Sequence, residues 1–140
     1  MKTWRFLFLI CLCLTIGMQG KAQTDTEDWN NINVLSSSVP EELIDVVTHN
    51  VSSPEFVYDK TFDLPNQYYF IDCNIPFARN FNITGGHISF IIDKEDFDFY
   101  IYRRYQQVGY FDLQIGFYVK IGPQYVQQLY KIGIVRIIFN

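Results

Sequence analysis

The clearest pattern along the chain is an unbroken alternation of apolar and mostly polar positions over residues 110–121. The apolar positions are Phe111, Leu113, Ile115, Phe117, Val119 and Ile121. Because successive side chains of a strand point to opposite faces, this alternation predicts a strand with one buried and one polar face.

Shorter alternations at residues 87–92 and 97–102 predict two more strands. Pairing Phe97 with Phe117, and Ile92 with Phe97, keeps the apolar side chains of all three strands on one face. Residues 87–121 are therefore predicted to form a three-stranded antiparallel meander.

Helical signals flank this region on both sides. Ser38 can cap a helix that carries apolar residues at helical spacing, which predicts a helix over residues 39–49. Pro123 suits a first helical turn and Gly133 a helix end, which predicts a short helix over residues 123–131. Residues 134–139 are then expected to form a closing strand.

Aromatic and β-branched residues dominate two segments earlier in the chain, residues 55–62 and 67–73. The turn sequence 63–66 between them predicts a hairpin, and residues 74–86 are interpreted as a loop.

These elements together predict an α+β fold. It consists of a mostly antiparallel sheet with an N-terminal helix and a short helix before the last strand. A cystatin-like arrangement, with the first helix packed across a curved meander, is one version of this fold. A β-sandwich is the alternative.

The first 22 residues have the three parts of a signal peptide. Lys2 and Arg5 precede an apolar run, and small residues at Gly20 and Ala22 favour cleavage after Ala22. The chain is thus expected to be exported to the periplasm, the cell surface or the medium, with no transmembrane segment after cleavage. Residues 23–37 are polar and acidic and are interpreted as a flexible leader before a single domain, residues 38–140.

The balance of charge argues against nucleic acid as a partner. The formal net charge is −4, and cleavage of the signal would remove three basic residues and make it more negative. Cys73 would then be the only cysteine, so no internal disulfide could form, and a buried, unreactive thiol is expected there.

Sequence motifs for catalysis or cofactor binding are absent, and we expect no cofactor. Only two histidines are present, His49 and His87, which argues against a zinc site. The acidic cluster at residues 93–98 does not match an EF-hand loop and is interpreted as a solvated hairpin turn, with a calcium site as the alternative.

The polar face of the predicted meander carries the candidate site. The predicted register places His87, Tyr102 and Asp112 in one row and Tyr100 and Gln114 in the next. Tyr118 flanks these rows. Such pairs can be a structural ladder, a binding face or, with His87 as a base, a catalytic site. Tyrosine-rich surfaces suit sugar rings or an extended peptide.

The aromatic-rich strands and the C-terminal sequence PQYVQQLYKIGIVRIIF resemble small exported proteins of unknown function from gram-negative bacteria. The resemblance implies an envelope location and no particular activity. We therefore expect an exported, non-enzymatic binding domain with a protein, peptide or carbohydrate partner, inhibitor-type roles included. The alternatives are a small hydrolase with His87 as its base and a purely structural envelope component.

Overall fold

The structure is a computed structural model that describes residues 38–140. The predicted signal peptide and leader lie outside the described residues. No helix in the described part of the chain is long and apolar enough to cross a membrane.

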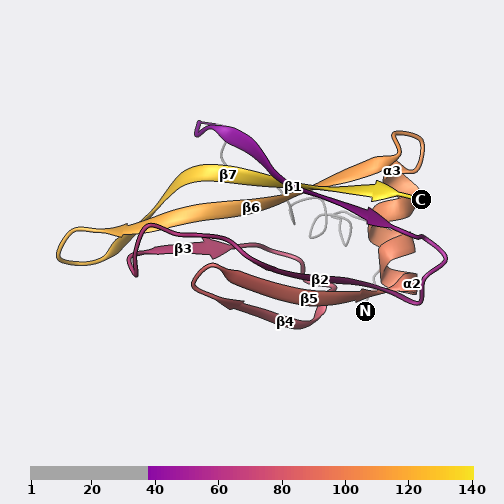
Figure 1. The fold of residues 1–140 in the computed structure, drawn as a ribbon, viewed down its shortest axis with the longest axis horizontal. Helices are drawn as coiled ribbons and strands as arrows, with labels where there is room; N and C mark the ends of the chain where they lie inside the picture. Colours follow the sequence, from indigo (N-terminus) through magenta and orange to yellow (C-terminus); the bar gives the residue numbers. More distant parts are fainter. Residues whose placement is uncertain (1–37) are drawn as a thin grey trace, which may run out of the picture. The chain divides into compact units, whose positions relative to one another are not determined.

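Residues 38–140 form two β-sheets (Figure 1). The four-stranded sheet has the order β1-β7-β6-β3, in which β1 is parallel to β7 and the other neighbours are antiparallel. Its strands are β1 (Glu41–His49), β3 (Tyr69–Asp72), β6 (Tyr110–Ile121) and β7 (Val126–Phe139). The antiparallel three-stranded sheet has the order β2-β5-β4, with β2 (Glu55–Thr61), β4 (Arg79–Thr84) and β5 (His87–Asp93).

One helical segment, residues 94–105, connects β5 to β6. It consists of α2 (Lys94–Phe97), a π-helical turn η1 (Asp98–Tyr102) and α3 (Arg103–Tyr105). The segment lies at the end of the sheets opposite the β6–β7 turn (Figure 1).

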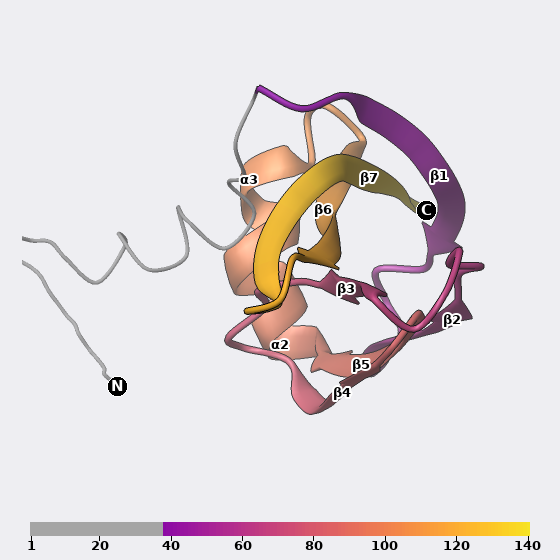
Figure 2. The same cartoon turned by 90° about the vertical axis from the view of Figure 1, so that its left-hand side faces the viewer.

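The hydrophobic core lies between the two sheets, which face each other in Figure 2. The core face of the four-stranded sheet supplies Ile71, Phe111, Leu113, Ile115, Phe117, Val135 and Ile137. The three-stranded sheet supplies Phe56, Tyr58, Ile88, Phe90 and Ile92, and the helical segment adds Phe97 and Ile101. Burial of this apolar surface is the main source of stability.

The strongest strand predictions are confirmed. Residues 110–121 form β6 with Phe111, Leu113, Ile115 and Phe117 buried, and residues 87–92 lie within β5. Residues 55–61 form β2, and the predicted closing strand lies within β7.

The prediction of a strand at residues 97–102 is wrong, because these residues are helical. Phe97 and Ile101 are buried one helical turn apart, whereas Phe99, between them in the alternation, is 53% exposed. Acidic residues in the first turn and Arg103 and Arg104 in the last turn also suit the helix dipole. The predicted three-stranded meander over residues 87–121 therefore does not form.

The prediction of a helix over residues 39–49 is also wrong, because residues 41–49 form strand β1. The strand pairs in parallel with β7, with a register shift between Leu43 and Asp45. The segment contains β-branched residues, and long-range pairing of this kind overrides a local helical pattern.

The short helix predicted over residues 123–131 is replaced by a tight turn at residues 122–125 and the first part of β7. β7 pairs with β6 as far as the Ile121–Val126 pair next to the turn. The antiparallel ladder therefore continues through a segment in which Pro123 and Gly133 favour a helix.

The predicted hairpin of residues 55–62 with residues 67–73 is wrong as well. β2 pairs with β5 and β3 pairs with β6, so the two segments belong to different sheets. The predicted loop, residues 74–86, contains β4, which forms a hairpin with β5 through a turn at Gly85, whose φ is 61°.

The fold is thus mostly antiparallel β-sheet with one short helical segment between strands. A cystatin-like arrangement needs the N-terminal helix that residues 41–49 do not form. Two sheets around a shared core agree with the sandwich alternative.

A partly buried polar contact joins the two sheets along their β1 and β2 edges. The Tyr58 hydroxyl donates to the Asp45 carboxylate at 2.8 Å, and Lys60 Nζ lies 3.6 Å from the same carboxylate. Burial and the hydrogen bond to Asp45 raise the pKa of Tyr58 above its ordinary value, because both favour the protonated hydroxyl that donates in this contact.

His49 is a buried polar residue at the end of β1, with 6% of its surface exposed. Its ring lies 5.1 Å from the ring of Phe56 and 4.4 Å from that of Phe97, measured between centroids. Burial lowers the pKa of His49; nearby Asp98 opposes this shift and Lys94 adds to it.

The lowered pKa of His49 predicts that acid destabilises the fold. The folded state disfavours the charged imidazole of His49. The stability that the neutral imidazole contributes above pH 6.5 is therefore lost as the pH falls through the lower pKa that His49 has in the folded protein. Urea unfolding between about pH 7.5 and about pH 5.5 measures this loss. His49→Phe keeps an aromatic ring and removes the titration, so its free energy of unfolding should fall less with acid. An equal fall in both proteins would contradict this account.

Candidate functional site

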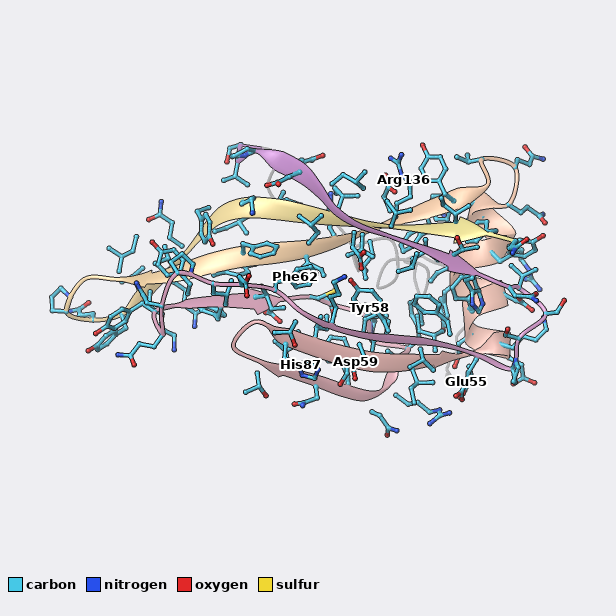
Figure 3. The ribbon with its side chains drawn as sticks, viewed as in Figure 1. Glu55, Tyr58, Asp59, Phe62, His87 and Arg136 are labelled. Atoms are coloured by element: carbon cyan, nitrogen blue, oxygen red, sulfur yellow. The ribbon has the colours of Figure 1, made fainter. Side chains whose placement is uncertain are left out.

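The structure disperses the residues predicted to form one site. His87 lies on β5, on the face of the three-stranded sheet that points away from the core (Figure 3). Its Nε2 atom is 2.9 Å from Asp59 Oδ1 of β2. The predicted row of His87 with Tyr102 and Asp112 is therefore wrong, because β5 does not pair with the segment that contains Tyr102.

Tyr100 and Tyr102 belong to the helical segment. The Tyr100 ring stacks on Phe77 at 4.4 Å between centroids, and the Tyr102 ring packs edge-on against Phe139 at 5.2 Å. These contacts join the helical segment to the loop before β4 and to the end of β7. Packing of the helical segment against the rest of the fold accounts for the positions of both tyrosine rings.

Asp112 lies on the outer face of β6 opposite Arg136 of β7. The guanidinium of Arg136 donates two hydrogen bonds of 2.8 Å to the Asp112 carboxylate and lies 4.2 Å from the Tyr110 ring centroid. This cross-strand arrangement is a stabilising ladder of the kind common on sheet surfaces. Gln114 follows Asp112 on the same face of β6, opposite Ile134.

Tyr118 is the predicted site residue that the structure places in an aromatic surface. It pairs across strands with Phe70 of β3, and the two rings are stacked at 5.3 Å between centroids. A Cβ atom at Gly116 would lie 2.6 Å from the Tyr118 ring, so the glycine lets this ring lie close to the sheet. Burial raises the pKa of Tyr118, with smaller contributions from Asp72 and Cys73.

A second ring pair lies beside the first. Tyr68 precedes β3 and stacks with Tyr125 of the β6–β7 turn, at 6.2 Å between centroids. Lys120 connects the two pairs: its backbone N–H donates to the Tyr68 carbonyl at 2.8 Å, and its ammonium lies 5.4 Å from the Phe70 ring centroid. We call this surface the aromatic end; it consists of Tyr68, Phe70, Tyr118, Lys120 and Tyr125.

The backbone of Tyr125 supports a functional role for the aromatic end. Its φ is 53°, in the left-handed region that glycine and asparagine favour. Tyr125 is also 58% exposed, so little burial in the fold compensates for this conformation. Non-glycine residues with such backbones concentrate at functional sites.

The sequence pattern predicts this surface only in part. The predicted candidate face includes Tyr118, whereas Tyr68, Phe70 and Tyr125 lie outside it. The predicted hairpin of residues 55–62 with 67–73 pairs Phe70 with the wrong strand, and the predicted helix over 123–131 includes Tyr125. If Gly122 and Pro123 are instead interpreted as a tight turn, the sequence predicts that β7 begins directly after it.

The outer face of the three-stranded sheet is the main polar alternative. Arg79 bridges Asp93 at 2.9 Å and Glu55 at 2.7 Å, while His87 contacts Asp59 farther along the sheet. Within residues 38–140, no group of three metal-ligating side chains is positioned to hold a metal ion. In the same region, no hydrogen bond joins the His87 imidazole to a hydroxyl or thiol nucleophile.

Cys73 is poorly suited to act as a nucleophile. Burial, with a contribution from the Asp72 charge, raises its pKa to about 12. Its sulfur lies 3.5 Å from the Gln114 carbonyl oxygen. The thiolate needed for attack is therefore scarce at neutral pH.

Comparison with known proteins gives no match to a family model, to a curated protein or to a solved structure. The function must therefore be argued from the geometry of the chain itself.

The environment of Cys73 predicts slow reaction with thiol reagents. In a chain lacking the first 22 residues, Cys73 is the only cysteine. Alkylation by iodoacetamide at about pH 8 should be at least about 100-fold slower in the native protein than in urea. Equal rates in the two conditions would show that the thiol is accessible and ionised, and would reopen a catalytic role for it.

Proposed function

We propose that this protein is a non-enzymatic binding domain that contacts its partner through the aromatic end. The observation that carries the proposal is the exposed, stacked ring pair Tyr68–Tyr125, which lies beside the half-buried Phe70–Tyr118 pair and includes the strained backbone of Tyr125. The sequence-based expectation of export places this binding in the cell envelope or outside the cell.

The chemistry of the aromatic end favours binding over catalysis. Tyrosine offers a large, flat surface and a hydroxyl while losing few rotamers on contact, so it is enriched where proteins meet partners. Tyr68 and Tyr125 are 42% and 58% exposed, which leaves much of both rings open to a partner.

The alternative of a hydrolase with His87 as its base has the His87–Asp59 contact in its favour. A carboxylate can hold an imidazole in one tautomer. However, Asp59 and His87 lie on an exposed sheet face, and no described nucleophile is joined to the imidazole. A purely structural role does not explain why the Tyr68 and Tyr125 rings are exposed.

A capture experiment tests the proposal. The protein and its Tyr68→Ser/Tyr125→Ser variant are immobilised, and envelope extract, polysaccharides and lipid vesicles are passed over both. We expect a partner that the parent retains and the variant releases, with a loss of affinity of at least about tenfold, as for central aromatic contacts.

A matched control removes exposed apolar side chains at the opposite end of the sheets. Phe99 and Val108 are 53% and 59% exposed, so Phe99→Ser/Val108→Ser alters a comparable surface near the helical segment. Equal loss of the partner by both variants, or none by either, would overturn the assignment of the aromatic end.

A further inference from the structure

The β6–β7 turn carries an unusual concentration of exposed apolar side chains. Ile121 and Val126 face each other across the two strands and are 47% and 60% exposed, and Tyr125 between them is 58% exposed. We call residues 121–126 the hairpin tip. It lies at the free end of the four-stranded sheet, away from the helical segment (Figure 1).

The residues behind the hairpin tip are arranged in layers. Lys120 pairs with Gln127 one position behind the Ile121–Val126 pair, so it lies about 3.4 Å farther back along the strand. The Tyr68 carbonyl accepts a hydrogen bond from the Lys120 backbone N–H, and the Phe70–Tyr118 pair lies farther from the tip along the same strands. The order from the tip backwards is therefore Tyr125 with the aliphatic pair Ile121 and Val126, then Tyr68 and Lys120, then the stacked pair Phe70–Tyr118.

The segment that carries the hairpin tip is basic, whereas the chain as a whole is acidic. Residues 113–140 contain no Asp or Glu. Within residues 38–140, Lys120 forms no ion pair; its ammonium instead lies over the Phe70 ring. Lys131, farther back, pairs with Glu42 at 3.2 Å.

This layering matches the depth profile of a bilayer surface. Aliphatic side chains favour the acyl boundary, tyrosine favours the headgroup level, and lysine extends its ammonium toward anionic headgroups. Interfacial segments bury their apolar side about 5–10 Å deep, which would take in the hairpin tip and bring Lys120 to the headgroups.

A glycan fits the hairpin tip less well than a bilayer. Sugar recognition needs polar groups that meet the hydroxyls around a stacking ring, whereas the side chains of Ile121 and Val126 offer neither donors nor acceptors.

We propose that the aromatic end and the hairpin tip dock on a lipid surface that contains anionic headgroups. This inference rests on the proposed function and names the partner of the same surface. The tip inserts Ile121, Tyr125 and Val126 at the interface, and Lys120 contacts the headgroups. Docking is peripheral and reversible, because the inserted area is small.

Vesicle co-sedimentation tests this docking. The purified protein is mixed with vesicles of phosphatidylcholine and phosphatidylglycerol in equal parts, and separately with vesicles of phosphatidylcholine alone. We expect stronger partition to the anionic vesicles. Raising the ionic strength from about 0.01 M to about 0.15 M should weaken it, because the Debye length falls from about 30 Å to about 8 Å.

Two variants separate the contributions of the surface. Tyr125→Ser/Val126→Ser should lower the partition coefficient at least about tenfold, since it removes apolar side chains from the tip. Lys120→Gln should lower it about fivefold on anionic vesicles and hardly at all on neutral ones. Lys94→Gln is the control, because Lys94 lies on the helical segment in an ion pair with Asp98.

The outcomes distinguish the two proposals. Partition that the tip variants do not change would overturn the docking assignment. No partition to either vesicle at low ionic strength, together with a soluble glycan or protein captured through Tyr68 and Tyr125, would overturn the lipid partner and leave the proposed function standing. Partition that depends on the tip and on Lys120 supports both.

Discussion

The long antiparallel pairing of β6 with β7 organises the four-stranded sheet and its side of the core. It extends from the Tyr110–Ile138 pair to the Ile121–Val126 pair. Its inner face supplies Phe117, Val135 and other core residues, and its two outer edges accept β1 and β3. Gly133 lies where an added Cβ would clash with Ile44 of β1 and with Phe117, so the backbone of β7 packs tightly against both.

The same pairing produces the aromatic end. Because the ladder continues to a tight turn, the tip presents its side chains beyond the shared core, and β3 brings Phe70 beside Tyr118. Gly116 leaves room for the Tyr118 ring, and Lys120 is held by the Tyr68 carbonyl. The scaffold thus fixes the aromatic side chains in place at a position where they add little to the core.

The sequence predicted the elements whose periodicity was unambiguous and failed where two periods competed. The strict alternation of β6 identified its core face at Phe111–Phe117, because only a strand places those residues together. In residues 97–102, Phe97 and Ile101 satisfy both a strand and a helix, and only burial of the helical face in the folded chain decides between them. The parallel pairing of β1 with β7 joins distant segments and has no local signal. The predicted site depended on the meander, which does not form. Of its residues, Tyr118 belongs to the aromatic end. The residues beside Tyr118 come from segments whose strand pairing the sequence does not indicate.

We infer that the aromatic end contacts a partner and is not needed for folding. The free energy of unfolding of Tyr125→Gly tests this most directly, since glycine adopts a φ of 53° without strain. We expect a free energy of unfolding within about 1 kcal/mol of the parent, because relief of the strained backbone offsets the lost Tyr68 contact and the added chain entropy. A loss of more than about 2 kcal/mol would show that Tyr125 is held in place for the fold, and would contradict the account.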